Sequence, residues 1–322
     1  MRTVFLIPYF GRFPNYFQFF LNSCRHNKNF DWMIFTDNTN TYDYPENVHI
    51  INMSFDECKK LIQSKFDFEI ALYTYNKLCD YKPAYGYIFQ DYIKDYDFWG
   101  HCDTDQIFGN LSLFYPDEFL ERFDKIGSLG HLTLYRNIEK ANLMFMEPLN
   151  GKQRYKEVYT NSQGLAFDEW LSGNINEIFL NSNCRLSLDN YGADVYPYRT
   201  CFSLIHFNVN EQRYVFDKVN NSVFKRNQGE LFYCFEKDSK IYELPIPYVH
   251  LQKRKMRIDI PVNTDNYFII PNCFVDEFKT SKKYLKISSR WKLCNYQYFK
   301  VKYASLKSRL KTRNWNRERI KL

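Results

Sequence analysis

Four short apolar runs alternate with helical patterns over residues 1–110, and this alternation limits the chain to an α/β fold. The apolar runs span residues 3–7, 31–35, 48–52 and 97–102. The helical patterns span residues 15–27 behind the N-cap Asn15, residues 54–66 behind a Ser54/Glu57 capping box, and residues 73–80, with a further helix after Pro83. Strands and helices in this order predict βαβ units and a mainly parallel sheet flanked by helices. Two further strands are expected at residues 131–135 and 248–251.

Polar loops follow three of these predicted strands, at residues 8–12, 36–38 and 103–105. The carboxyl ends of parallel strands meet at one edge of a sheet, and ligands of open α/β folds bind beyond that edge. We therefore expect these three loops to line one site.

The loop after the fourth predicted strand contains two carboxylates separated by one residue, Asp103-Thr104-Asp105. Hard oxygen ligands of this kind bind Mg²⁺ or Mn²⁺, which can also hold two phosphates at once. The D-x-D pattern is common by chance, and an acidic loop that caps the next helix is the alternative. Its place at a strand end favours a metal site with Asp103 and Asp105 as ligands and Thr104 close to the donor.

The segment FWGHCDTDQIFGN at residues 98–110 resembles the D-x-D block of a family of bacterial polysaccharide-biosynthesis glycosyltransferases with the GT-A fold. Further blocks match in the same order over residues 1–257: IPYFGRFPNYF, FTD, KLCDYKPAYG, GHLTLYRN, FDEW and HLQKRKM. The resemblance implies a GT-A domain at residues 1–280, with a nucleotide-binding half at 1–110 and an acceptor-binding half at 111–280. It also implies a nucleotide-sugar donor, with UDP expected from the fold, and a lipid-linked saccharide acceptor in capsule or O-antigen synthesis.

The resemblance also suggests which residues contact the donor. In similar enzymes a lysine ahead of the metal strand reaches the donor phosphates, and here that lysine is Lys82. Asp80 is expected to contact the donor sugar or to cap a helix. The first strand of such folds is followed by the nucleoside site, which assigns the nucleoside to a set of four residues: Tyr9, Phe10, Arg12 and Asp37. Ordinary packing of Tyr9 and a turn at Asp37 are the alternatives.

A late histidine completes the metal ligands in many GT-A enzymes, and His250 stands at the end of a predicted strand. A neutral imidazole suits a mixed oxygen and nitrogen site for Mn²⁺. A lone histidine is more often structural, but the cations that follow it favour the ligand role. Lys253 is the first of these cations and is expected to contact the diphosphate.

An inverting transferase needs a general base for the acceptor hydroxyl, and we expect this base to be Asp168, with Glu169 as substitute. The alternative is an acidic pair at a helix N-terminus, and a retaining enzyme would need no such base. His131, with Tyr135 and Arg136, is expected to border the acceptor pocket or the core. Asp194 is better explained as a turn residue.

Residues 282–322 carry 14 Lys and Arg against the single acid Glu318, although the net charge of the whole chain is only +7. These cations are interleaved with Trp and Leu, which predicts a basic, aromatic, helical tail at residues 281–322 lying on an anionic membrane surface. The protein is then expected to be cytoplasmic, peripheral on the inner face of the plasma membrane. A solvated tail is the alternative, and nucleic-acid binding is not expected because residues 1–281 are acidic overall.

Two other classes of protein share parts of this pattern. A phosphohydrolase of the haloacid dehalogenase type also uses a D-x-D motif, but it carries the motif on its first strand. A non-catalytic carbohydrate-binding protein would explain the 19% aromatic content and leave the D-x-D loop, Lys82 and His250 without a purpose. The nine Cys form no C-x-x-C pair, so neither a zinc site nor a disulfide framework is expected.

Overall fold

The computed structural model describes residues 1–169, 173–188, 192–194, 203–208, 213–217, 222–252, 255–270 and 273–276, together with Leu285, Phe299, Tyr303 and Leu306. The predicted tail at residues 281–322 therefore lies almost entirely outside the described residues. None of the described helices is long and apolar enough to cross a membrane.

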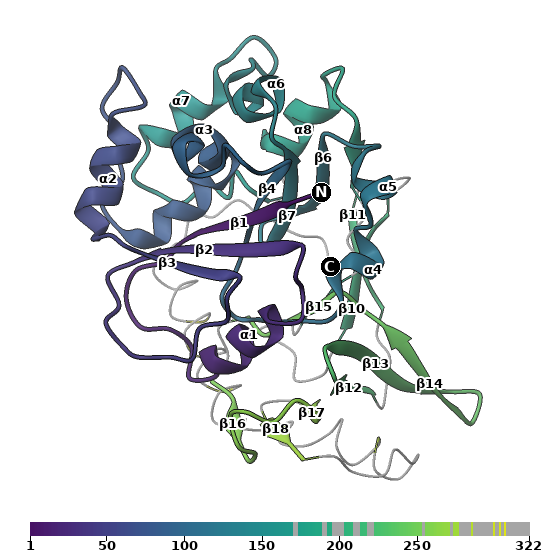
Figure 1. The fold of residues 1–322 in the computed structure, drawn as a ribbon. Coiled ribbons are helices and arrows are strands. Elements are labelled where there is room, and N and C mark those ends of the chain that lie inside the picture. Colours follow the sequence, from purple (N-terminus) through teal and green to yellow (C-terminus); the bar gives the residue numbers. More distant parts are fainter. Residues whose placement is uncertain are drawn as a thin grey trace.

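Seven of the described strands form the largest sheet, in the order β3 (Val48–Asn52), β2 (Phe30–Thr36), β1 (Thr3–Pro8), β4 (Phe98–Cys102), β7 (Leu132–Arg136), β6 (Lys125–Leu129) and β8 (Leu186–Ser187). β3, β2, β1 and β4 run parallel to one another, with Thr3 of β1 beside Phe30 of β2 and Phe98 of β4. β7 is antiparallel to both β4 and β6, and β8 is parallel to β6. The predicted α/β fold with a mainly parallel sheet is confirmed (Figure 1).

Helices cover both faces of this sheet because side chains alternate along its buried central strand. Val4 and Leu6 of β1 point into one apolar layer, whereas Phe5 and Ile7 point into the other. The first layer is closed by α2 (Phe55–Gln63), η1 (Tyr75–Ala84), α3 (Tyr85–Ile88), η3 (Met144–Met146), α7 (Arg154–Tyr159) and α8 (Ile175–Leu180). The second layer is closed by α1 (Phe17–Cys24), α4 (Leu111–Phe114) and α5 (Asp117–Leu120). The short elements η2 (Gln90–Tyr92) and α6 (Glu139–Leu143) are the other described helices.

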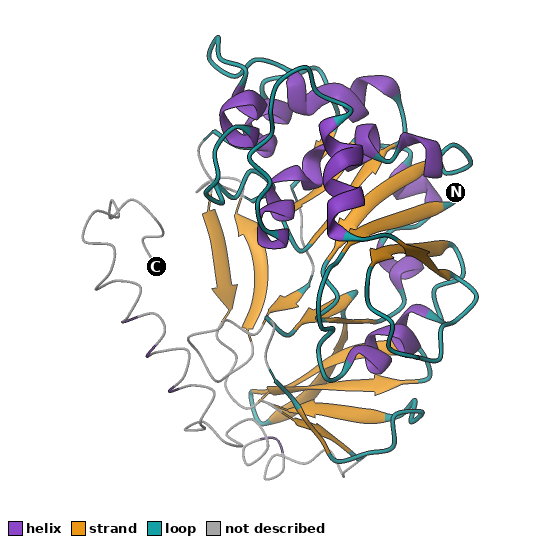
Figure 2. Cartoon of the chain, turned by 90° about the vertical axis from the view of Figure 1, so that its left-hand side faces the viewer, coloured by secondary structure: helices purple, strands orange, loops and turns teal. Residues whose placement is uncertain are grey.

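The remaining described strands form two further sheets (Figure 2). One has the order β11 (Arg213–Asp217), β10 (Ser203–Asn208), β9 (Ala193–Asp194), β15 (Tyr248–His250) and β5 (Gln106–Phe108). The other has the order β14 (Lys240–Pro245), β13 (Glu230–Lys237), β12 (Ser222–Asn227), β17 (Tyr267–Ile270), β18 (Cys273–Val275) and β16 (Arg257–Ile258). Helix α1 joins this last sheet to the first, since its Phe17 and Phe20 pack below the parallel strands while Phe19 stacks on Phe274 at 4.7 Å between ring centroids.

The predicted helices match the structure unevenly. The Ser54/Glu57 capping box is present, and α2 begins directly after it. Asn15 is not the cap of α1, which begins at Phe17, because its side-chain amide instead donates to the carbonyl of Met256 at 2.7 Å. The helix predicted at residues 73–80 is present with other bounds, as the 3₁₀ helix η1 (Tyr75–Ala84). A 3₁₀ helix aligns the side chains at positions i and i+3, and the site depends on that alignment.

Candidate functional site

The acidic turn Asp103–Asp105 links two sheets, because it follows the last residue of β4 and precedes the first residue of β5. Its backbone is held on both sides. The amide of Asp103 donates to the carbonyl of His131 at 3.1 Å, and the carbonyl of Asp105 accepts from the amide of Leu251 at 2.8 Å. Both carboxylates are thus fixed at the carboxyl end of the parallel strands, where the sequence predicted a ligand site.

His250 completes a cluster with these two carboxylates. It ends β15 and pairs in register with Gln106 of β5, so the strand pairing brings it to the turn from a distant part of the chain. Its Nε2 lies 3.2 Å from Oδ1 of Asp105 and 3.7 Å from Oδ2 of Asp103. One ligand atom from each of the three residues lies within 4.8 Å of the others. Two carboxylates and an imidazole are a donor set that suits Mn²⁺ or Mg²⁺, so these residues fit the predicted cation.

A second histidine supports the first. The ring of His131 stacks on that of His250 with centroids 4.3 Å apart and planes 25° apart. The Nε2 of His131 lies 3.1 Å from the hydroxyl of Tyr248, two residues before His250 on the same strand. His131 therefore lies beside the cluster of Asp103, Asp105 and His250. Its predicted companions lie elsewhere: Tyr135 is buried in the core and stacks on Trp99, and Arg136 pairs with Asp124.

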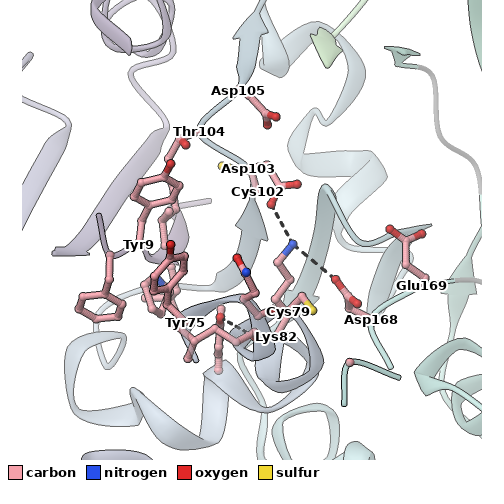
Figure 3. Close-up of a pocket in the computed structure, with 18 of the residues that line it drawn as sticks. Tyr9, Tyr75, Cys79, Lys82, Cys102, Asp103, Thr104, Asp105, Asp168 and Glu169 are labelled. Carbon is pink, nitrogen blue, oxygen red and sulfur yellow. Dashed lines mark hydrogen bonds and ion pairs between the residues drawn. The ribbon is translucent and has the colours of Figure 1, made fainter. Parts of the chain in front are cut away.

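Lys82 connects the acidic turn to a second pair of acids. Its Nζ donates to Oδ1 of Asp103 at 2.8 Å and to the carbonyl of Gly130 at 2.8 Å, and lies 3.4 Å from Oδ2 of Asp168 (Figure 3). Burial acts to lower the pKa of Lys82, but the two carboxylates outweigh it and hold this pKa well above its ordinary value. Burial likewise acts to raise the pKa of Asp103, yet Lys82 and His250 hold it well below its usual range. The lysine is thus charged and Asp103 ionised.

Asp168 and Glu169 stand together against a glycine. A side chain at Gly130 would collide with Oδ2 of Asp168 and would lie 2.8 Å from Oε1 of Glu169. Burial raises the pKa of Asp168 to about 7, against the lowering effect of Lys82. Burial also raises the pKa of Glu169. An acid with a pKa near neutrality is suited to accept and release a proton at physiological pH.

These groups face a cavity of about 580 Å³. Figure 3 shows Tyr9, Tyr75 and Thr104 at one end, Asp168 and Glu169 at the other, and Lys82 between them. Burial and the nearby Asp105 raise the pKa of Tyr9 to about 12, so its phenol stays protonated. The full lining consists of Leu6, Ile7, Pro8, Tyr9, Phe10, Pro14, Tyr75, Asn76, Leu78, Cys79, Lys82, Tyr85, Cys102, Asp103, Thr104, Asp105, Gly164, Ala166, Asp168 and Glu169.

Three residues predicted to contact the donor are not among those that line this cavity. Arg12 is exposed, and its carbonyl accepts the hydroxyl of Tyr9 at 2.9 Å. Asp37 is exposed and accepts from the amide of Gly11 at 3.3 Å, which is a loop contact. Asp80 is buried, does not line the cavity, and accepts hydrogen bonds from the amides of Leu165 and Phe167. Lys253 lies outside the described residues.

Residues that the sequence did not single out complete the lining. Cys79 and Asn76 lie one and two 3₁₀ steps before Lys82, and Tyr75 lies next to Asn76. Only the correct helix type would have placed Cys79 and Asn76 on the face of Lys82. Gly130 directly follows β6 and is the first residue of the GHLTLYRN block. A larger residue does not fit there because the carboxylates of Asp168 and Glu169 pack against its Cα. That contact is long-range and has no local signal.

Comparisons with known proteins give a family but no activity. A family model described as "Family of unknown function (DUF6625)" matches residues 5–278. A search of curated protein sequences found no match. The solved structure of the galactosyltransferase LgtC in complex with donor and acceptor sugar analogs is similar over 62% of this chain and 77% of that chain, with 12% sequence identity and a TM-score of 0.33. A likeness this distant assigns no activity to the chain.

Proposed function

The chain belongs to the family of unknown function DUF6625, and from its site we propose that it is a glycosyltransferase with a nucleotide-sugar donor and a divalent cation. One observation carries the proposal. The ligand atoms of Asp103, Asp105 and His250 lie within 4.8 Å of one another, and the two aspartates line the same cavity as Lys82 and Asp168. A cation site, a fixed lysine and an acid with a raised pKa in one cavity are the groups that transfer from a diphosphate donor needs.

The donor end of the cavity is the one lined by Tyr9, Tyr75 and Thr104. Two phenol rings offer flat apolar faces to a nucleobase, and a hydroxyl offers a hydrogen bond to the ribose. Asp103, Asp105 and His250 would hold Mn²⁺ or Mg²⁺, and a bound cation would offset the negative charge of the diphosphate. Lys82 places a further positive charge at the same point, and its three contacts keep it there without reorganisation during the reaction.

The acceptor end is the one lined by Asp168 and Glu169. Asp168 takes the proton of the acceptor hydroxyl as that oxygen attacks the anomeric carbon and the bond from this carbon to the diphosphate breaks. A pKa near 7 lets the carboxylate do this at neutral pH. Lys82 holds Asp168 at 3.4 Å and so orients it toward the cavity. Glu169 lies beside it and is the substitute base.

The finer parts of the proposal come from the sequence. The resemblance of the ordered blocks favours a UDP-sugar, a lipid-linked saccharide acceptor and a role in surface polysaccharide assembly. The basic tail at residues 282–322 favours a cytoplasmic protein held on an anionic membrane. Deleting residues 282–322 should reduce sedimentation with anionic liposomes and leave donor binding unchanged; equal sedimentation of both proteins would exclude this role for the tail.

Nucleotide release from UDP-, GDP- and CMP-sugars in the presence of Mn²⁺ tests the main proposal. We expect one donor to be turned over only when a divalent cation is present. Release of phosphate from a simple phosphoester would favour the phosphohydrolase instead, although the D-x-D loop follows β4 and not β1. Binding of saccharides without any nucleotide binding would favour the non-catalytic alternative.

A further inference from the structure

A buried ion pair lies behind the cavity wall, on the helix that carries Lys82. Lys77 and Asp80 are 2% and 0% exposed, and Nζ of the lysine lies 2.6 Å from Oδ2 of the aspartate. They are three positions apart on η1, which aligns their side chains. Burying two charges costs desolvation free energy, which further hydrogen bonds to the pair must offset. The partners of these further hydrogen bonds therefore indicate what the pair does.

All remaining bonds of the pair among the described residues reach one segment of the chain. Nζ of Lys77 donates to the carbonyl of Val158 at 2.9 Å and to that of Gln163 at 2.6 Å. Asp80 accepts from the amide of Leu165 at 2.9 Å through Oδ2 and from the amide of Phe167 at 2.9 Å through Oδ1. Each partner thus binds the backbone of residues 158–167 twice.

The residue enclosed by these bonds has an unfavourable backbone conformation. Ala166 has a φ of 51°, in the left-handed region that residues with a Cβ rarely adopt. Its two neighbours, Leu165 and Phe167, are the residues whose amides bind Asp80. Such conformations persist where surrounding contacts determine them, and they gather at functional sites. Asp80 therefore holds the turn at Ala166 in this shape.

The turn leads directly to the two acids of the cavity. Asp168 follows Phe167, lies 3.4 Å from Lys82 and packs with Glu169 on Gly130. Lys82 itself is on η1, two residues after Asp80. The buried pair thus fixes the loop that carries the proposed base to the helix that carries the lysine it faces.

We propose that Lys77 and Asp80 are positioning residues that clamp residues 163–169 onto η1 and so set Asp168 in the cavity. The effect of this clamp on catalysis rests on the proposed function, whereas the existence of the clamp does not. Within the described part of the chain, the hydrogen bonds of Lys77 and Asp80 join the two residues to each other and to the backbone of residues 158–167, so the clamp acts first on the acceptor end.

The test compares Asp80→Asn with wild type by two independent readouts. The first is hydrogen exchange of peptides covering residues 158–169. The variant keeps one acceptor oxygen and replaces the other with an NH2 donor, so one of the two amides loses its acceptor and the segment is expected to exchange faster. The second is turnover of the nucleotide sugar together with binding of UDP and Mn²⁺. We expect kcat to fall by about 100-fold, the effect of a displacement on the order of 1 Å, while the Kd for UDP with Mn²⁺ stays within about threefold.

Two further variants keep the outcome decisive. Asp91→Asn is the matched control, because Asp91 and Lys94 form an exposed pair with the same spacing at 2.9 Å, and it should change neither readout. If Asp80→Asn does not fold, the double variant Lys77→Met/Asp80→Leu removes both buried charges and still leaves the two amides without an acceptor.

Unchanged exchange at residues 158–169 would overturn the clamp. A kcat within about threefold of wild type, or loss of UDP binding in parallel with kcat, would overturn the positioning role. If wild type turns over no nucleotide sugar, the proposed function fails, and the exchange measurement alone decides the clamp.

Discussion

Removing the Lys82 ammonium should destabilise the protein by an amount that the structure allows to be worked out. Lys82→Met keeps most of the buried volume and leaves the carboxylates of Asp103 and Asp168 without their shared cation. At an effective dielectric constant of about 20, ion pairs at 2.8 Å and 3.4 Å represent roughly 6 and 5 kcal/mol of gross attraction. Most of this offsets the several kcal/mol that an ammonium loses on leaving water.

The net loss should be about 3 kcal/mol, at the lower end of the range for breaking a buried pair. Asp103 is 30% exposed, so solvent screens its carboxylate once the lysine is gone. At roughly 2 °C per kcal/mol for a chain of this size, the Tm should fall by about 6 °C. The matched control is Lys94→Met on the exposed Asp91 pair, for which we expect a change within about 0.5 kcal/mol.

The loss should grow with pH. Burial already raises the pKa of Asp168 to about 7, and removing Lys82 takes away the charge that opposes this rise. An acid whose folded pKa exceeds its unfolded pKa loses stability as pH rises from the unfolded value through the folded value. Thermal unfolding should therefore place the variant closer to wild type at about pH 6 than at about pH 8.5. A Tm equal to that of wild type at both pH values would refute this account of Lys82.

Two other predictions concern Lys125, the first residue of β6, and Gly130, which directly follows that strand. Burial lowers the pKa of Lys125 to about 7, so wild-type stability should rise with pH from that value towards the unfolded value of about 10.4. In urea unfolding at several pH values, Lys125→Met should lack this rise of the unfolding free energy with pH, although the substitution also removes the 2.6 Å bond to Asn176. An unchanged pH dependence in the variant would contradict this account of Lys125. Gly130→Ala should lower kcat by about 100-fold in a folded protein, because its Cβ would displace Asp168 and Glu169; normal turnover would mean that these acids do not need the glycine.

Local patterns in the sequence predicted the part of the fold that depends on neighbouring residues. The apolar runs of β1 to β4 and the Ser54/Glu57 capping box are short-range features, and both are present. The position of Asp103 at a strand end followed from the same alternation. Lys82 was assigned to the site through the family resemblance, and the structure brings it to Asp103.

Other features of the fold and the site depend on contacts between distant segments, which local patterns do not encode. Asp80 was expected to contact the donor sugar or cap a helix, and in the structure it binds the backbone amides of Leu165 and Phe167. No residue near Asp80 in the sequence indicates these partners. Asn15 is a residue type that often caps helices, yet its side-chain amide donates a hydrogen bond to the carbonyl of Met256. His250 meets the acidic turn only because β15 pairs with β5 in one particular register, and a shift of one residue would turn it away.

The central claim is that Asp103, Asp105 and His250 hold a divalent cation beside the nucleotide. Electron paramagnetic resonance of free Mn²⁺, titrated with wild-type protein and with Asp105→Asn, tests it most directly. We predict one bound Mn²⁺ per wild-type chain, tighter binding when UDP is added, and at least about a tenfold weaker affinity in the variant. Equal Mn²⁺ binding by the two proteins, or UDP binding that is the same with and without Mn²⁺, would contradict the metal site and the function proposed from it.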